Sequence, residues 1–163
     1  YSDVGHGAEE AAGGGKRYGT GEIRIDDIHL LDAEGQPIES APTGSAVALR
    51  LRYTARQRVE RPVFGVSLAT AGGKHLWSYD GIAAGAVPDS IDAGSGSLDI
   101  RIDRLALMPD LFDVNADVKD HHKTRTFDAL ERSLRFQVTS GSPRAAGGSM
   151  VLDASMTMPM TES

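Results

Sequence analysis

The chain has 163 residues, enough for one domain, and 40% of them are apolar, enough for a buried core. Its formal net charge of −6 lacks the basic balance that a nucleic-acid-binding surface needs, so we expect no nucleic-acid partner. The absence of cysteine excludes disulfides, thiolate metal sites and cysteine nucleophiles.

The first 17 residues are rich in Gly, Ala and Glu and have no periodicity, which predicts a linker or N-terminal arm over residues 1–17. No apolar run approaches the roughly 18 residues of a membrane-spanning helix. The start lacks the basic and then apolar segments typical of a signal peptide. The chain does not begin with Met, so we interpret it as a fragment of a longer protein.

From Glu22 onward, apolar and polar residues alternate, which indicates strands with one buried face. A skip at Asp26 and Asp27 places two residues where one belongs and predicts a β-bulge. A fourth strand is predicted over residues 74–79. The inward residues of the six other strands, in chain order, are Ile23, Ile25, Ile28 and Leu30; Val47, Leu49, Leu51 and Tyr53; Phe64, Val66 and Leu68; Leu98, Ile100 and Ile102; Phe112, Val114, Ala116 and Val118; and Leu134, Phe136 and Val138.

Between these strands we expect turns, a Gly/Ala/Ser/Pro-rich loop over residues 81–96, and one helical turn over residues 126–132 capped by Thr126 or Asp128. Residues 140–149 read as a flexible linker. Beyond it, alternation over residues 150–158 predicts an eighth strand on a tether. This strand docks either on its own sheet or on that of a second copy, and such an exchange would give a symmetric dimer.

Short strands separated by turn residues predict an all-β fold, an antiparallel β-sandwich of immunoglobulin-like or jelly-roll type with about eight strands. We place the sandwich domain at residues 18–139.

Two sequence features resemble enzymatic sites. Gly13-Gly14-Gly15-Lys16 resembles a phosphate-binding loop, but Glu10 stands where that motif has Gly, and Arg17 where it has Ser or Thr. The fragment therefore has no Walker A site. The carboxylates of Asp113 and Asp117 share an outward strand face, as a glycosidase pair would, but exposed carboxylates keep near-normal pKa values and serve poorly as general acids. We expect no enzyme activity and no cofactor.

Adjacent His121 and His122, beside Asp120, offer a candidate metal corner. Neighbouring residues on a strand point to opposite faces, so both imidazoles rarely reach one ion. We favour a solvated turn and expect no metal.

Two groups of residues are candidates for binding a ligand. Trp77 and Tyr79 lie one pleat apart, so their rings share a face beside Asp80 and could pack against sugar C–H groups, unless Trp77 closes the core. The second group is polar and small residues on outward strand faces, whose alternative role is an ordinary solvated surface. Its members are Gly65, Ser67, Asn115, Asp117, Lys119, Arg135 and Gln137.

Three motifs carry a family resemblance over roughly residues 16–138. They are Tyr18-Gly19-Thr20-Gly21-Glu22, Pro62-Val63-Phe64-Gly65-Val66, and Phe127-Asp128-Ala129-Leu130-Glu131 leading into Leu134-Arg135-Phe136-Gln137-Val138. Together they resemble the C-terminal carbohydrate-binding domain of the ATP-binding subunit of O-antigen polysaccharide ABC transporters, the Wzt family.

The resemblance implies a β-sandwich appended to an ATPase, which recognises O-antigen polysaccharide without catalysis and couples its binding to export. It implies a cytoplasmic location at the inner face of the bacterial inner membrane. The implied partners are the polysaccharide, a second copy in a homodimer, and the transporter's membrane subunit through the parent ATPase domain. An alternative is a structural dimerisation module without glycan contact. The family pattern does not fix the ligand residues.

Overall fold

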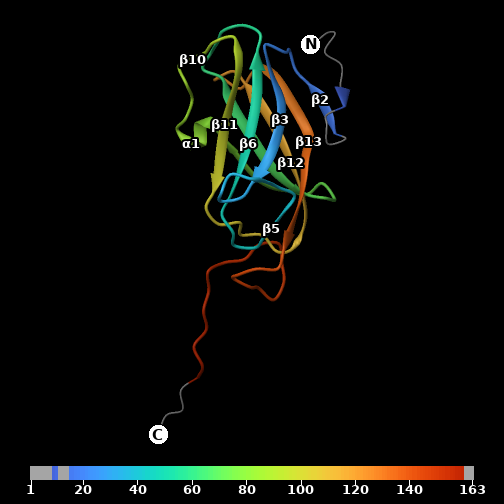
Figure 1. Ribbon diagram of the computed structural model, residues 1–163, viewed down its shortest axis with the longest axis vertical. Helices are drawn as coiled ribbons and strands as arrows, with labels where there is room; N and C mark the ends of the chain where they lie inside the picture. Colours follow the sequence, from blue (N-terminus) through green and yellow to red (C-terminus); the bar gives the residue numbers. More distant parts are fainter. Residues whose placement is uncertain (1–8, 11–14, 160–163) are drawn as a thin grey trace.

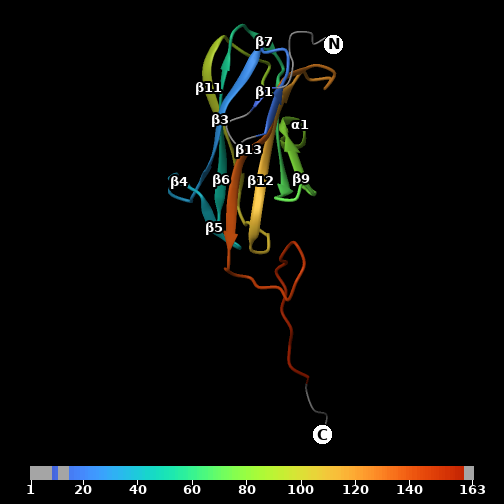
Figure 2. The ribbon, with the colours of Figure 1, turned by 90° about the vertical axis from the view of Figure 1, so that its right-hand side faces the viewer.

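Two β-sheets packed face to face form the fold in the computed structural model, which describes residues 9–10 and 15–159 (Figures 1 and 2). The larger sheet follows the order β1 (Glu9–Glu10), β2 (Lys16–Tyr18), β13 (Thr126–Thr139), β12 (Asp110–Lys119), β8 (Val63–Thr70) and β9 (His75–Asp80), with β5 (Ser40–Pro42) also pairing with β13. The smaller sheet follows the order β11 (Gly94–Ile102), β6 (Val47–Ala55), β3 (Ile23–Leu31) and β4 (Pro37–Ile38). A separate short pair joins β7 (Val59–Glu60) to β10 (Ser90–Ile91).

Alternating burial builds the core between the sheets. Ile23 and Ile25 of β3, and Leu49 and Leu51 of β6, are almost completely buried, whereas Arg24, Arg50 and Arg52 beside them are exposed or half-buried. Val114 and Val118 of β12 meet them from the larger sheet. Burying one such side chain contributes about 1.5–3 kcal/mol, so these three strands carry much of the fold's stability.

The predicted β-sandwich is confirmed. Seven strands among the described residues have six or more residues, and they fall where the alternation places them. The bulge in β3 is confirmed by a register shift between Ile25 and Asp27. After the shift, Asp27 lies across from Arg52 and accepts hydrogen bonds from its guanidinium.

The helical turn predicted over residues 126–132 is wrong, because β13 runs unbroken from Thr126 to Thr139. Phe127, Leu130 and Leu134 have helical spacing only because β13 is bulged: Leu130 lies across from Ala116, and Leu134 across from Val114. Arg132, with φ of 51°, lies within this bulge.

Asp128 does not cap a helix. Its buried carboxylate accepts a hydrogen bond of 2.8 Å from the backbone N–H of Ile25 and lies 3.4 Å from Arg17. Burial raises the pKa of Asp128, while the bond from Ile25 and the charge of Arg17 act in the opposite direction. This carboxylate therefore links β13 to β3, across the two sheets.

The sheets are not wholly antiparallel, since β5 runs parallel to the end of β13. Ala41 is buried there, and Thr43 just beyond donates its backbone N–H to Thr139 at 2.9 Å. The predicted loop over residues 81–96 contains the short helix α1 (Gly81–Ala84), β10 and the start of β11. At the other end of the chain, β2 begins at Lys16, within the predicted arm.

The C-terminal segment leaves the body as an extended tail (Figures 1 and 2). Met150 makes an isolated bridge to Leu107, and Val151 is buried and donates its N–H to Ala106 at 3.0 Å. Residues 152–159 belong to no sheet in the single chain, so the predicted eighth strand has no partner within it. No helix in the described part of the chain is long and apolar enough to cross a membrane.

Candidate functional site

Residues directly across from one another in a sheet point to the same face, so strand register shows which side chains meet. One row crosses five strands on the outer face of the larger sheet. It consists of Tyr18, Ala129, Asp117, Gly65 and Asp80, contributed by β2, β13, β12, β8 and β9 in that order. Ala129 and Gly65 are small residues, whereas Tyr18, Asp117 and Asp80 carry aromatic or polar side chains.

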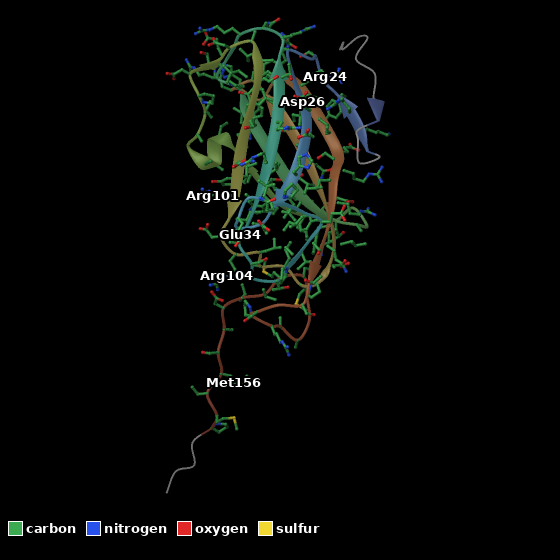
Figure 3. All side chains as sticks on the ribbon, viewed as in Figure 1. Arg24, Asp26, Glu34, Arg101, Arg104 and Met156 are labelled. Carbon is green, nitrogen blue, oxygen red and sulfur yellow. The ribbon has the colours of Figure 1, made fainter. Side chains whose placement is uncertain are left out.

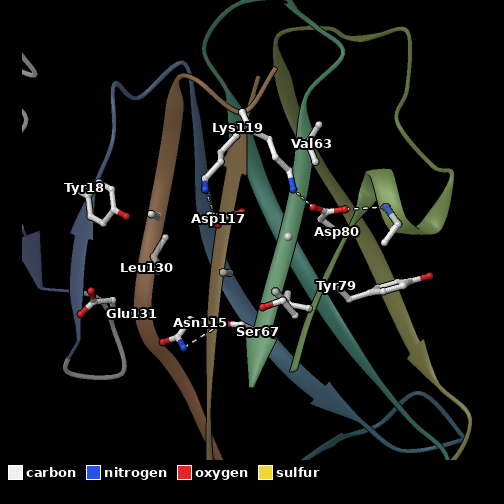
Figure 4. Close-up of a pocket in the computed structure, with 17 residues that line it drawn as sticks. Tyr18, Val63, Ser67, Tyr79, Asp80, Asn115, Asp117, Lys119, Leu130 and Glu131 are labelled. Carbon is white, nitrogen blue, oxygen red and sulfur yellow. Dashed lines mark hydrogen bonds and ion pairs between the residues drawn. The ribbon is translucent and has the colours of Figure 1, made fainter. Parts of the chain in front are cut away.

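A second row lies next to the first and consists of Asn115, Ser67 and Ser78. Together the rows surround a hollow of about 340 Å³, which we call the outer hollow (Figure 4). Gly65 leaves this space open: a Cβ atom there would lie 2.8 Å from Asp117 Oδ1 and 3.4 Å from Asp80 Cβ. The lining residues are Tyr18, Val63, Gly65, Val66, Ser67, Ser78, Tyr79, Asp80, Ala83, Asn115, Ala116, Asp117, Lys119, Lys123, Ala129, Leu130 and Glu131.

Asn115 is held by two bonds across the sheet. Its side-chain amide donates to Ser67 Oγ at 3.2 Å, and its oxygen accepts the backbone N–H of Arg132 at 2.7 Å. An amide has two N–H groups and two lone pairs, so one donor and one acceptor remain for a ligand. The bulge of β13 thus fixes the orientation of a polar group at the hollow.

Charged groups line one side of the outer hollow (Figure 4). Asp80 caps α1 by accepting the backbone N–H of Ala83 at 2.9 Å, and it forms an ion pair with Lys123. The hydrogen bond from Lys123, followed by that from Ala83, lowers the pKa of the Asp80 carboxyl. Lys119 Nζ lies 3.8 Å from Asp117 Oδ2. Burial raises the pKa of Asp117, against the opposing charges of Lys119 and Lys123.

Tyr18 is the aromatic wall of the outer hollow. It is 48% exposed and lies across from Ala129. In the sequence, Tyr18 stands out only within a motif that carries the family resemblance, and neither Tyr18, Lys123 nor Glu131 is among the predicted site residues. Only the pairing of β2 with β13 places Tyr18 at the outer hollow, and no local sequence pattern reveals that pairing.

Trp77 and Tyr79 lie differently. Their ring centroids are 5.5 Å apart with an interplanar angle of 10°, so the predicted shared face is found. However, Trp77 lies across from Leu68, and Tyr79 across from Val66, both buried residues. The two rings therefore pack toward the core side of β9. Tyr79 lies at the edge of the outer hollow, where its ring points away from Asp117 (Figure 4), and Trp77 is not among the lining residues.

The structure brings together five of the outward candidates with Asp80 and Tyr79, and leaves three candidates apart. Those at the outer hollow are Gly65, Ser67, Asp80, Asn115, Asp117 and Lys119. Besides Trp77, Arg135 and Gln137 lie elsewhere. Arg135 makes a two-pronged ion pair with the buried Asp113, with distances of 2.7 and 3.0 Å. Gln137 lies across from Leu111 near the far end of β13.

His121 and His122 lie in the turn after β12, with ring centroids 3.8 Å apart. Among the described residues, no group of three or more His, Cys, Asp or Glu side chains gathers as a metal site would require.

Comparisons with known proteins agree with this architecture. A search of curated proteins gives no match. The crystal structure of the C-terminal domain of Wzt is similar, with a TM-score of 0.78 and 17% identity over 88% of each chain. A Niemann-Pick type C2 protein from the Japanese carpenter ant shares the fold more distantly, with a TM-score of 0.51 and 7% identity over 74% of this chain and 96% of that one.

The family model of the Wzt C-terminal domain matches residues 15–152, which include every strand that lines the outer hollow. This chain belongs to the Wzt C-terminal domain family.

Proposed function

We propose that this domain recognises O-antigen polysaccharide without altering it, and that the outer hollow holds the glycan. Membership of the Wzt C-terminal domain family supports a role in the O-antigen ABC transporter. The observation that carries the glycan proposal is the composition of the hollow. Donors and acceptors from Ser67, Asn115 and Asp117 converge over a floor opened by Gly65.

Each part of the hollow has a role that suits a sugar. The ring of Tyr18 offers a flat apolar face for sugar C–H groups. The free N–H and lone pair of Asn115 and the carboxylate of Asp117 are partners for ring hydroxyls. The site is open and shallow, so little ligand is buried, and a single site is expected to bind with a Kd on the order of 1 mM to 1 μM.

A hydrolase is the second candidate, because two carboxyls at the hollow have pKa values shifted in opposite directions, as an acid and base would. Against it, both oxygens of Asp80 are occupied, Oδ1 by the N–H of Ala83 and Oδ2 by Lys123. Each oxygen keeps a second lone pair, but the lowered pKa makes this carboxylate a weak base and a weak nucleophile. We therefore favour binding without catalysis.

In the parent protein, the domain would follow an ATPase domain, lie at the cytoplasmic face of the inner membrane and contact the membrane subunit through that ATPase. A second copy would complete a homodimer, which suits a transporter with two ATPase subunits. Two sites on one dimer would raise the apparent affinity for a repeating polymer, provided that both engage one chain. The remaining alternative is a structural dimerisation module that contacts no glycan.

Titration calorimetry with the O-antigen polysaccharide of the source strain tests the proposal. Saturable binding is expected, with no increase in reducing ends during incubation. Asn115→Ala should weaken binding, and Thr54→Ala, on the outer face of the other sheet, should leave it unchanged. An absence of heat and of NMR shifts with this polysaccharide would leave the dimerisation module as the better explanation. Accumulating reducing ends would support the hydrolase.

A further inference from the structure

Asp117 is flanked by two small residues on the outer face of the larger sheet. Ala129 of β13 lies directly across from it on one side, and Gly65 of β8 lies directly across on the other. Ala129 is only 7% exposed and Gly65 has no side chain, so both form floor and not wall in the outer hollow. A flat group laid across β12 beside Asp117 therefore has room on either side of the strand.

Asn115 and Asp117 present a donor and an acceptor along one strand. They lie two residues apart on the same face of β12, a spacing of about 6.6 Å (Figure 4). The bonds to Ser67 and Arg132 use one N–H and one lone pair of the Asn115 amide, so its second N–H remains available. Ionised Asp117 offers only acceptors, and Lys119 Nζ, 3.8 Å from its Oδ2, is beyond normal hydrogen-bond distance. The gap between the two side chains therefore suits a ligand that both donates and accepts.

A secondary amide fits this gap. Such an amide is planar and trans, so its N–H and C=O point in opposite directions. With hydrogen bonds of about 2.9 Å, its N–H can reach Asp117 while its carbonyl oxygen reaches the N–H of Asn115. The two carbon substituents of the amide then lie across the strand, one toward Ala129 and the other toward Gly65.

An apolar corner on the Ala129 side separates an amide from a pair of hydroxyls. Two hydroxyls on neighbouring ring carbons could make the same two hydrogen bonds, but they bring no apolar group to this floor. The ring of Tyr18 lies beyond Ala129 on β2. The methyl of an acetyl group would contact both the Ala129 side chain and this ring, and its burial would favour the amide.

The charge of the outer hollow disfavours an acidic sugar. Three carboxylates line it, those of Asp80, Asp117 and Glu131, with only two lysines, Lys119 and Lys123. Lys123 forms an ion pair with Asp80, and Lys119 lies beside Asp117. The excess charge is therefore negative, which repels a carboxylate or phosphate and leaves a neutral amide unaffected.

We infer that the outer hollow takes a sugar that carries an acetamido group. The acetamido N–H donates to Asp117, and its carbonyl oxygen accepts from Asn115. Its methyl group lies on Ala129 beside Tyr18, and the sugar ring extends over Gly65. The inference rests on the proposed function and names the class of sugar that this site selects.

NMR titration with matched pairs of methyl glycosides tests the inference. N-acetylglucosamine is compared with glucose, and N-acetylgalactosamine with galactose. In at least one pair the acetamido sugar should bind about tenfold or more tightly than its hydroxyl partner, with the largest shifts at Asn115, Asp117 and Tyr18. The O-antigen polysaccharide of the source strain is titrated in parallel.

Two variants should abolish this preference. Ala129→Val fills the floor that the methyl group needs and should leave binding of the hydroxyl sugar largely unchanged. Asn115→Asp keeps an acceptor for the N–H of Arg132 but cannot donate to the acetamido carbonyl. Ala48→Val is the matched control and should keep the preference, because Ala48 lies between the buried Val47 and Leu49 and so faces outward on the other sheet.

Several results would overturn the inference and leave glycan recognition standing. These are equal affinities within both pairs, a preference that survives both variants, and binding of the polysaccharide when it contains no acetamido sugar or when neither acetamido glycoside binds. If neither the polysaccharide nor any of the four glycosides binds, glycan recognition itself fails.

Discussion

Gly65 lies directly across the β8–β12 ladder from Asp117, and the space that a side chain would take at Gly65 is the space in which the Asp117 carboxylate faces the outer hollow. A glycine within a strand weakens it, because it has more freedom to lose on folding and no side chain to pack. Here the missing side chain of Gly65 leaves the outer hollow open.

Gly65→Ala is expected to reduce glycan affinity by about tenfold or more, equivalent to roughly 1.4 kcal/mol. The new methyl group would lie 2.8 Å from Asp117 Oδ1 and displace that carboxylate into the hollow. Gly72→Ala, in the turn before β9, is the matched control because its Cβ would meet only Thr70 Oγ1 at 3.8 Å. Calorimetric titration of both variants checks the prediction; equal affinities would place the glycan elsewhere.

Asp117→Asn should make the pH dependence of stability smaller. Burial raises the folded-state pKa of Asp117 above its ordinary value of 3.8, so the folded protein binds this proton more tightly than the unfolded chain. That stabilisation is full below pH 3.8 and is lost as pH rises through the raised folded pKa. The variant should therefore gain stability relative to wild type as pH rises above about 4.

Urea unfolding at several values between pH 4 and pH 7 measures this gain. Asp99→Asn provides a control of opposite sign, since the hydrogen bond from Arg50 lowers the pKa of Asp99 and stabilises the fold above its unfolded pKa. That variant should be less stable than wild type by a nearly constant amount between pH 4 and pH 7, because the contribution of Asp99 is almost complete above pH 3.8. If Asp117→Asn loses stability in the same way, the carboxylate is well solvated or well paired.

Asn115→Ala should lower both stability and glycan affinity. It removes the bond to Ser67 and leaves the backbone N–H of Arg132 without its acceptor, at a cost on the order of 1 kcal/mol in unfolding free energy. Ser67→Ala removes one of these two bonds and should cost less. Thermal unfolding measures the loss of stability in both variants, and calorimetric titration measures the loss of affinity. An Asn115→Ala protein of unchanged stability would show that the bulge needs no side-chain support.

Trp77→Ala and Tyr18→Ala should have opposite consequences. Trp77 packs on the core side of β9, so its loss should cost on the order of 2 kcal/mol, below the 3–5 typical of a fully buried ring, and leave glycan affinity unchanged. Tyr18 edges the outer hollow, so its loss should weaken binding at nearly constant stability. A folded Trp77→Ala protein that cannot bind glycan would restore the sequence-based assignment of Trp77 as a ligand residue.

The sequence predicts the parts of this fold that regular alternation specifies. In β3, β6 and β12, every second residue is apolar, and the burial follows the pattern through the bulge at Asp27. In β13 the bulge at Arg132 breaks the two-residue period and imitates helical spacing, so local reasoning selects the wrong element.

The outer hollow is harder to predict because it is made by pairing between distant segments. Asn115, Asp117 and Ser67 are found from their outward positions on predicted strands, but Tyr18 joins them only through the contact of β2 with β13. Trp77, by contrast, is predicted to bind the ligand but lies outside the outer hollow. Apolar residues occupy both faces of β9, and only its register against Leu68 reveals which way the ring points.

Tyr79 and Asp80 line both the outer hollow and a second cavity of about 780 Å³, which Leu98 and Ile100 of β11 also line (Figure 3 shows the side chains of the whole domain). A strand that serves two sites couples them, and coupling between two binding equilibria is reciprocal. If a group bound in the second cavity shifts β9 toward the geometry that a sugar prefers, then a bound polysaccharide must strengthen binding in that cavity by the same factor.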